Sequence, residues 1–431
     1  MPEVRCLAEV RLWGRTVGAI AELDDGTIVS EYAEEFRRER LEISPIHLPV
    51  RRPGPVTLAE LARKPAFNGL PGVFADSLPD AFGNLVIRAY YAARGEDELA
   101  MSPVQRLLYV GERAIGAFTY HPAVSIPTRP AEQESLELAS LVRSARQVVA
   151  GSPDVAIPEI YLIGSSAGGM RPKALVWHHP ATGEIRSGHA PPKDGAVPSL
   201  LKFDGVGDAG TSDALAAPAP FNRVEAAYAA MAREAGITLP DIAVLPGNDG
   251  YAHLLITRFD LEPDGSRIHQ HTLGGLLHVD YNDPGASSYE EFLRTALRLG
   301  APPSDLAEIY LRMVFNVLAV NQDDHVKNHS FHMRADGGWR LAPAYDLTFA
   351  QGAGFTRQHQ MRVNDKLSGI TRADLLAVAG MFGIKAAPKA IARVEATVAD
   401  WPRHAAATEV PGTVIAEIGT ALAARRREVG L

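Results

Sequence analysis

A mostly apolar helix that runs straight into a polar cluster is the feature that most constrains this fold. Residues 309–320 carry mainly apolar side chains, which predicts a buried helix. The next eight residues read Asn321-Gln322-Asp323-Asp324-His325-Val326-Lys327-Asn328. Charged side chains delivered by a core helix need partners, because burial of an unpaired charge is costly in free energy. A metal ion or a nucleotide would supply such partners, and a solvated polar loop is the alternative.

The spacing of the acidic and amide residues is typical of phosphoryl transfer. Asn328 follows Asp323 by five positions, and a further carboxylate, Asp346, comes later in the chain. Protein kinases use an Asp in this order to orient the attacking hydroxyl, and an Asn and a later Asp to hold Mg²⁺ on the phosphates. The usual His-Arg pair before the first Asp is absent. Residues 331–342 predict a short hairpin that returns Asp346 to the neighbourhood of Asp323.

The composition indicates a soluble globular protein of two or three domains. The 431 residues are 46% hydrophobic and 22% charged. A net charge of −8 argues against a protein that mainly coats nucleic acid. The single cysteine, Cys6, cannot form an internal disulfide, which favours a reducing compartment. Because the chain shows no secretory signal and no long apolar run, we expect a cytoplasmic protein with no membrane partner.

Strands dominate the first part of the chain and helices the last. Expected strands cover residues 4–13, 15–22, 27–32, 111–120, 160–163, 173–177, 199–203 and 253–259. Expected helices cover residues 83–94, 136–149, 223–235, 289–299, 306–320, 372–380, 387–401 and 414–427. This order predicts an α+β, two-lobed, protein-kinase-like fold with an extra module in front. Its parts are residues 1–125, 126–286 and 287–431. The basic run Arg425-Arg426-Arg427 is expected to be a solvated helix end.

A serine- and glycine-rich loop is the first candidate for binding phosphate. It spans residues 164–172 and contains Ser165, Ser166, Ala167, Gly168 and Gly169. Its glycines let backbone N–H groups approach an anion closely, although a flexible hairpin turn explains them equally well. Met170 stands where a Walker A loop needs a lysine, so that motif is excluded.

Lys202 and Glu225 continue the series of candidates. Lys202 sits in an apolar strand, where its ammonium group would face either a phosphate or solvent at a strand edge. Glu225 lies at the start of the next predicted helix. It would either orient Lys202 toward the phosphates of ATP or complete a capping box with Asn222.

Taken in order, the motifs resemble the HipA family of bacterial serine/threonine-protein kinase toxins. The matching segments are Phe74-Ala75-Asp76-Ser77-Leu78-Pro79-Asp80, Ser165-Ser166-Ala167-Gly168-Gly169, Arg171-Pro172-Lys173, Leu201-Lys202, Arg258-Phe259-Asp260, Asp323-Asp324-His325-Val326-Lys327-Asn328-His329-Ser330 and Pro343-Ala344-Tyr345-Asp346. The resemblance implies a HipA-coupling module over residues 1–125, a kinase N-lobe over residues 126–286, and an all-helical C-lobe over residues 287–431. The family's own form of the catalytic loop lacks the His-Arg pair.

The resemblance also implies roles for individual residues. It makes Asp323 the catalytic base, Lys202 the lysine on the ATP phosphates, and Asn328 and Asp346 the Mg²⁺ ligands. The autophosphorylated serine falls on Ser165 or Ser166. The remaining residues implied to bind ATP are Ala167, Gly168, Gly169, Glu225, Thr257, Phe259, His325 and Lys327. Asp324 stands where the family often has glycine, which leaves the metal geometry open.

The function implied is that of an ATP- and Mg²⁺-dependent protein kinase, the toxin of a type II toxin–antitoxin pair. Its expected partners are a HipB-like helix-turn-helix antitoxin, operator DNA reached through that antitoxin, and a protein substrate of which an aminoacyl-tRNA synthetase is one candidate. Three alternatives stay open. They are a small-molecule phosphotransferase, a metal-dependent hydrolase built on residues 323–325 and 346, and a non-enzymatic nucleotide-binding co-regulator of transcription.

Overall fold

The computed structural model describes residues 2–95, 101–125, 136–152, 171–190, 193–206, 220–247, 250–262 and 264–431. The chain forms two compact units. Unit 1 comprises Met1–Ala219 and Ala243–Gln270, and unit 2 comprises Pro220–Ile242 and His271–Leu431. The predicted division into three parts stays a prediction. None of the described helices is both long and apolar enough to cross a membrane.

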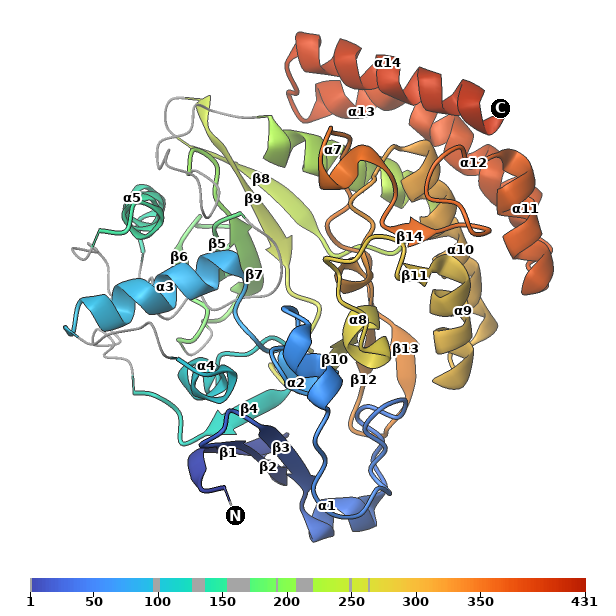
Figure 1. The fold of residues 1–431 in the computed structure, drawn as a ribbon. Coiled ribbons are helices and arrows are strands. Elements are labelled where there is room, and N and C mark those ends of the chain that lie inside the picture. Colours follow the sequence, from blue (N-terminus) through green and yellow to red (C-terminus); the bar gives the residue numbers. More distant parts are fainter. Residues whose placement is uncertain are drawn as a thin grey trace. The chain divides into compact units, whose positions relative to one another are not determined.

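Unit 1 begins with a four-stranded antiparallel sheet in the order β3-β2-β1-β4 (Figure 1). The strands are β1 (Val4–Leu12), β2 (Arg15–Leu23), β3 (Ile28–Tyr32) and β4 (Phe118–His121). The β1–β2 hairpin turns at Trp13-Gly14, both with positive φ, as two-residue hairpin turns require. Alternate residues of β1 are fully buried, which fixes the face that meets the core.

Two of the helices described in unit 1, α3 (Ala81–Ala92) and α4 (Pro103–Val110), begin with side-chain caps. The other α-helices described there are α1 (Glu34–Glu39), α2 (Gly72–Ala75) and α5 (Leu138–Val149). Asp80 caps α3 by accepting from Gly83 N at 2.7 Å, and Ser102 with Gln105 forms a capping box at α4. Helix α4 was not predicted, and only the end of the predicted strand 111–120 is a strand.

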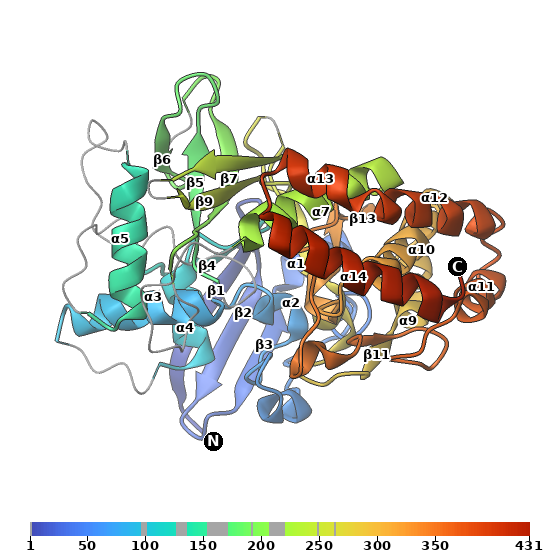
Figure 2. The same ribbon diagram turned by 90° about the horizontal axis from the view of Figure 1, so that it is seen from above.

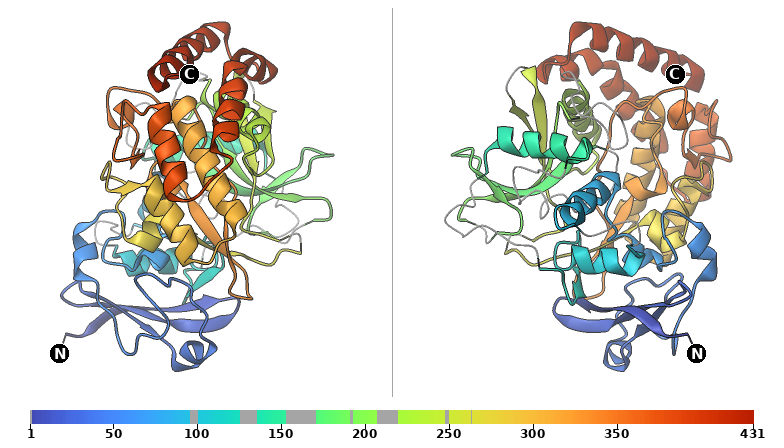
Figure 3. Two further views of the ribbon diagram at one scale, coloured as in Figure 1. Left: turned by 90° about the vertical axis from the view of Figure 1, so that its right-hand side faces the viewer. Right: turned by 60° about the vertical axis from the view of Figure 1, so that its left-hand side comes forward.

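A five-stranded sheet completes unit 1 in the order β6-β5-β7-β9-β8. Its strands are β5 (Lys173–His178), β6 (Ile185–Ser187), β7 (Val197–Lys202), β8 (Ile242–Pro246) and β9 (Ala252–Thr257). Helices α3 and α5 pack with it around one apolar core (Figure 3) that includes Val86, Leu141, Val176 and Leu201. This core fixes β7, the strand that ends in Lys202.

Unit 2 is mainly helical and is organised around α10 (Pro303–Leu318), which contacts α9, α12 and α14. The other helices are α7 (Phe221–Ala235), α8 (Leu273–Leu277), α9 (Tyr289–Arg298), α11 (Arg372–Met381), α12 (Ala387–Ala399), α13 (Trp401–Ala407) and α14 (Gly412–Val429). Figure 2 shows α14 beside α12 and α13. The single helix predicted over residues 387–401 is wrong at its end, because the chain breaks at Asp400 and starts α13 with Pro402 in its first turn.

Unit 2 also contains short strands, so the expected all-helical C-lobe needs correction. The predicted hairpin is present, with β12 (Ser330–Met333) antiparallel to β13 (Trp339–Leu341). The hairpin forms a three-stranded sheet with β10 (His269–Thr272), where the chain enters unit 2. A parallel pair joins β11 (Ser287–Ser288) to β14 (Met361–Arg362). These strands hold the segments on either side of the polar cluster.

Candidate functional site

The end of α10 turns the chain sharply into the polar cluster. Val320 follows the helix with a φ of 53°, and the N–H of Asn321 reaches back to the carbonyl oxygen of Asn316 at 3.0 Å. A β-branched residue rarely adopts this left-handed conformation, which usually belongs to glycine at a helix end. Val320 is only 1% exposed, so packing of its side chain holds the strained backbone. The loop that follows therefore starts from a fixed direction.

Asp323 lies in this loop with its carboxyl group half open to solvent. Its side chain is 42% exposed, and Oδ1 lies 3.9 Å from Nε2 of His325. Partial burial, together with the carboxylates of Asp346 and Asp324, raises the pKa of Asp323 to about 7. A carboxyl group with a pKa near neutrality is suited to accept a proton at physiological pH.

Asn328 and Asp346 are each connected with Asp323, Asn328 by a hydrogen bond and Asp346 through the electrostatic effect of its carboxylate. The amide nitrogen Nδ2 of Asn328 donates to the carbonyl oxygen of Asp323 at 2.8 Å, so its Oδ1 is the atom that can bind a cation. The hydroxyl of Tyr345 donates to the carbonyl oxygen of Lys327 at 2.8 Å, which ties the segment carrying Asp346 to the loop. Asp346 has a φ of 53°, and such strain in a non-glycine residue is common at functional sites.

These residues fit a magnesium ion. An amide oxygen and a carboxylate are the hard oxygen ligands that Mg²⁺ prefers. The negative charge of Asp346 also acts on Asp323 and raises its pKa, and a bound cation would relieve that repulsion. Binding of Mg²⁺ by Asn328 and Asp346 stays a prediction.

His325 and Lys327 border the same loop beside an aromatic ring. Burial lowers the pKa of His325 to about 4, so the imidazole is neutral at physiological pH. Its ring centroid lies 5.3 Å from that of Tyr281, and Nζ of Lys327 lies 5.4 Å from the same Tyr281 ring. The neutral imidazole and the ammonium group therefore flank Tyr281, at a distance typical of a cation–π contact for Lys327.

Asp324 lies in an environment unlike that of its neighbour Asp323. It is 1% exposed, and its carboxylate accepts from Tyr289 Oη (2.9 Å), His359 Nδ1 (3.0 Å) and Gln360 N (2.7 Å). Burial alone would raise its pKa, but His359 and these hydrogen bonds outweigh burial and lower it. Asp324 is thus an anchored, ionised group in the core. A hydrolase that uses Asp324 as a metal ligand is not supported.

In unit 1, Lys202 is buried at 6% exposure in a central strand, so the alternative of a solvated strand edge is wrong. Lys173 stands directly opposite it on β5. Nζ of Lys173 pairs with Oδ2 of Asp80 at 3.3 Å, and both side chains are almost fully buried. Directly opposed residues share one face of a sheet, so two lysines and the segment ending at Asp80 meet there. The motifs at residues 74–80, 171–173 and 201–202 thus form one charged cluster.

The predicted adenine hinge lies where β9 ends. Thr257 is the last residue of β9, and Phe259 is half-buried in the turn that follows. Arg258 donates to Asp260 through Nε (2.9 Å) and Nη2 (2.7 Å), and Gly116 N donates to the same carboxylate at 2.9 Å. The Arg-Phe-Asp motif therefore has a structural role within unit 1. Contact of Thr257 and Phe259 with a nucleotide stays a prediction.

Helix α7 starts at Phe221 with Pro220 at its N-cap, so the capping box between Asn222 and Glu225 is wrong. Glu225 is buried, at 5% exposure. Because it belongs to unit 2 and Lys202 to unit 1, their pairing stays a prediction.

The loop residues Ser165, Ser166, Ala167, Gly168 and Gly169 lie outside the described residues.

The C-terminal basic run is the solvated helix end expected from the sequence at two of its three arginines, and Arg425 is the exception. Arg425 is 6% exposed, whereas Arg426 and Arg427 are exposed. Nη1 of Arg425 donates to Nε2 of His359 at 3.1 Å. No sequence motif marked His359, Gln360 or Tyr289, because they meet Asp324 only through folding of distant segments. The arginine run was visible in the sequence, but its helical phase alone did not show which arginine turns inward.

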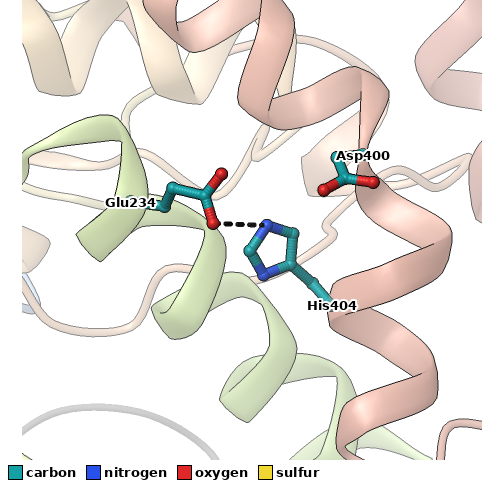
Figure 4. Close-up of side chains that lie close together, drawn as sticks. All are labelled: Glu234, Asp400 and His404. Carbon is teal, nitrogen blue, oxygen red and sulfur yellow. Dashed lines mark ion pairs between the residues drawn. The ribbon is translucent and has the colours of Figure 1, made fainter.

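Among the described residues, a second acidic cluster has the spacing of a metal site. It contains Glu234, Asp400 and His404 (Figure 4). His404 Nε2 lies 3.5 Å from Glu234, but Arg403 bonds to Glu234 through Nη2 at 2.5 Å and to Asp400 through Nε. The guanidinium group of Arg403 already neutralises the two carboxylates. We therefore interpret this cluster as an ion-pair network between α7 and α13.

Comparisons with known proteins give consistent matches. The family model "HipA-like C-terminal domain" matches residues 165–404, more than half of the chain, and "HipA N-terminal domain" matches residues 8–121. A protein of Sinorhizobium fredii (strain NBRC 101917 / NGR234), named "Putative kinase Y4dM", is 24% identical over 366 residues, which cover 80% of this chain and 78% of that protein. Among solved structures, HipA from the Shewanella oneidensis MR-1 complex of HipA, HipB and operator DNA aligns with a TM-score of 0.70 at 16% identity, over 98% of both chains. The structural match establishes the similarity of fold.

Proposed function

Because the chain belongs to the HipA family, we propose that it is an ATP- and Mg²⁺-dependent serine/threonine protein kinase. The observation that carries the proposal is the arrangement of the loop, in which Asn328 donates to the backbone of Asp323 and the Asp346 carboxylate acts on the Asp323 side chain. Phosphoryl transfer depends on positioning and charge neutralisation, and this loop offers both a proton acceptor and oxygen ligands. The kinase name of the S. fredii relative agrees with it.

In the proposed mechanism Asp323 orients the serine or threonine hydroxyl and accepts its proton. Asn328 and Asp346 would hold Mg²⁺, which neutralises charge on the phosphates of ATP. Lys202 would contact a phosphate oxygen, with Glu225 as its partner. Thr257 and Phe259 would border the adenine. His325 and Lys327 complete the loop, and Lys327 offers a positive charge near the transferring group.

We propose further that the kinase is the toxin of a toxin–antitoxin pair. The solved relative with the same fold was captured with HipB and operator DNA. For this chain the corresponding partners would be a HipB-like helix-turn-helix antitoxin and, through it, operator DNA. A protein such as an aminoacyl-tRNA synthetase would be the substrate. Autophosphorylation would fall on Ser165 or Ser166.

Incubation with labelled ATP and Mg²⁺, followed by mapping of phosphosites, tests the activity. We expect a labelled serine in the loop of residues 164–169 for the wild type and no label for Asp323→Ala. Equal labelling of the two proteins would overturn the assignment of Asp323. Release of free phosphate without a phosphoprotein would favour hydrolysis, and transfer only to a small molecule would favour a small-molecule phosphotransferase. Nucleotide binding without any transfer would favour the non-enzymatic co-regulator.

A further inference from the structure

We infer that Arg425, close to the end of the C-terminal helix α14, is a positioning residue for the catalytic loop. It acts through His359 and Gln322 and touches neither the proposed metal ligands nor the substrate hydroxyl. The inference rests on the proposed kinase function, because the loop in question is the one that carries Asp323. Helix α14 would therefore contribute to kinase activity through Arg425.

Arg425 makes two buried contacts with the segments around the loop. Its Nη1 lies 3.1 Å from His359 Nε2. With the Gln322 amide oriented to satisfy its neighbours, Oε1 of Gln322 accepts from Arg425 Nη2 at 3.1 Å, and its nitrogen donates to Thr356 O at 3.0 Å. The guanidinium group also pairs with Glu428 through Nε at 3.0 Å. All three sides of the planar group are therefore engaged, which a lysine could not reproduce.

The contact with His359 determines what that ring can do for Asp324. Because Arg425 can only donate, His359 Nε2 must accept, so the ring proton is on Nδ1. That proton points at Asp324 Oδ2, 3.0 Å away. The ionised carboxylate of Asp324 requires the same tautomer, so the two contacts agree. Without Arg425, Nε2 would lose its donor and the ring would lose one of the two contacts that hold its rotamer. The arginine thus supports the orientation in which His359 donates to Asp324.

Asp324 in turn fixes the backbone of the catalytic loop. Its carboxylate also accepts from Tyr289 and Gln360, and Asn316 Nδ2 donates to the Tyr289 hydroxyl at 2.8 Å. Asp324 and Asp323 share a peptide bond, so immobilising one restricts the direction of the other. A displacement of about 1 Å at a catalytic group can reduce turnover on the order of 10²-fold.

The structure argues that these contacts are more than general packing. Arg426 and Arg427 are exposed on the same helix, and Arg426 bonds to Glu395 on α12 at 2.7 Å. Only Arg425 turns toward the segments that carry Asp324 and Gln322. Helix α14 also contacts α10, so its position is defined relative to the helix that delivers the loop.

Steady-state kinetics of Arg425→Gln and of the matched exposed variant Arg427→Gln test the inference. We expect kcat of Arg425→Gln to fall about 10- to 100-fold with the KM for ATP little changed, because binding groups stay in place. Arg425→Lys should recover only part of the loss, and Arg427→Gln should match the wild type. An unchanged kcat in Arg425→Gln, or equal losses in both arginine variants, would overturn the inference.

A second measurement separates this inference from the kinase proposal. Hydrogen–deuterium exchange of peptides covering residues 321–330 needs no activity, and Arg425→Gln should speed exchange there while α9 keeps its protection. Asp324→Asn should also speed exchange in residues 321–330 while α9 keeps its protection, because it removes the carboxylate to which Arg425 is linked through His359. Uniformly faster exchange across unit 2 would indicate a purely structural role and would refute the inference. Wild-type protein without kinase activity but with the local pattern would refute only the kinase proposal.

Discussion

Asp260 in unit 1 and Asp324 in unit 2 are both buried carboxylates that accept three hydrogen bonds. Asp260 is bound by two nitrogens of Arg258 and by Gly116 N, so a full positive charge touches it directly. Asp324 is bound by a tyrosine hydroxyl, an imidazole and a backbone N–H, and Arg425 is connected to it through the imidazole of His359. Both regions bury a carboxylate with three hydrogen-bond donors. The guanidinium group is in direct contact in the case of Asp260 and is separated by an imidazole in the case of Asp324.

The residues around each carboxylate determine its structural role. Asp260 joins the end of β9 to the segment before β4, and both belong to the framework of unit 1. Asp324 adjoins Asp323, whose raised pKa shows that its charge is unfavourable where it stands. Asp260 therefore contributes to the stability of unit 1, whereas Asp324 restrains the backbone next to the proposed base Asp323.

The largest effect is expected for Asp323→Asn. The change removes the proposed base and should lower phosphotransfer by about 10²- to 10⁴-fold. Stability should stay the same or rise by on the order of 1 kcal/mol after allowance for solvent screening, because one carboxylate leaves a crowded site. Activity assays with ATP and Mg²⁺ measure the first effect, and urea unfolding in Mg²⁺-free buffer at pH 8 measures the second. A clearly less stable variant would contradict the view that this charge is unfavourable.

Asp260→Ala should cause the largest loss of stability. It leaves the buried guanidinium of Arg258 without its carboxylate and removes the acceptor of Gly116 N, which together should cost about 3–5 kcal/mol. Urea unfolding gives the number, with the exposed Asp194→Ala in the same unit as control. An equal free energy of unfolding for Asp260→Ala and the control would contradict the stabilising role given to Asp260.

The stability supplied by Asp260 should depend on pH. Burial alone would raise its pKa, but Arg258 and Gly116 N more than compensate and lower it from 3.8 to about 2. A lowered carboxyl pKa means that the stabilisation is present above about pH 4 and is lost as the pH falls toward 2. The loss should reach about 2 kcal/mol. Urea unfolding of the wild type and Asp260→Asn should give a smaller difference in the free energy of unfolding at pH 3 than at pH 6. An equal difference at both pH values would contradict this pH dependence.

The smallest effect is expected for Arg258→Lys. A lysine keeps the charge beside Asp260 but cannot make the two parallel bonds that Nε and Nη2 make now. We expect a loss of about 1 kcal/mol of stability by urea unfolding. Kinase activity at a temperature well below unfolding should be unchanged. Reduced activity at full stability would instead connect the end of β9 with catalysis.

The sequence predicted most regular elements because their apolar spacing is local. Strands β1, β2 and β3, helices α5, α9, α10 and α14, and the hairpin behind the polar cluster lie close to their expected bounds. Helix α4 was missed, and the helix predicted over residues 387–401 was split at Asp400. Proline is accepted in a first helical turn, so Pro402 is compatible with a new helix that begins at Trp401.

The candidate residues could be recognised from the chain alone, because the order of Asp323, Asn328 and Asp346 and the family motifs do not depend on folding. Which carboxylate faces solvent and which is anchored depends on the folded structure. Asp323 and Asp324 are adjacent and chemically identical, so no pattern separates them. The difference arises from Tyr289, His359 and Arg425, which come from distant segments and meet Asp324 in the folded core. Burial and hydrogen bonding, unlike residue type, depend on those long-range contacts.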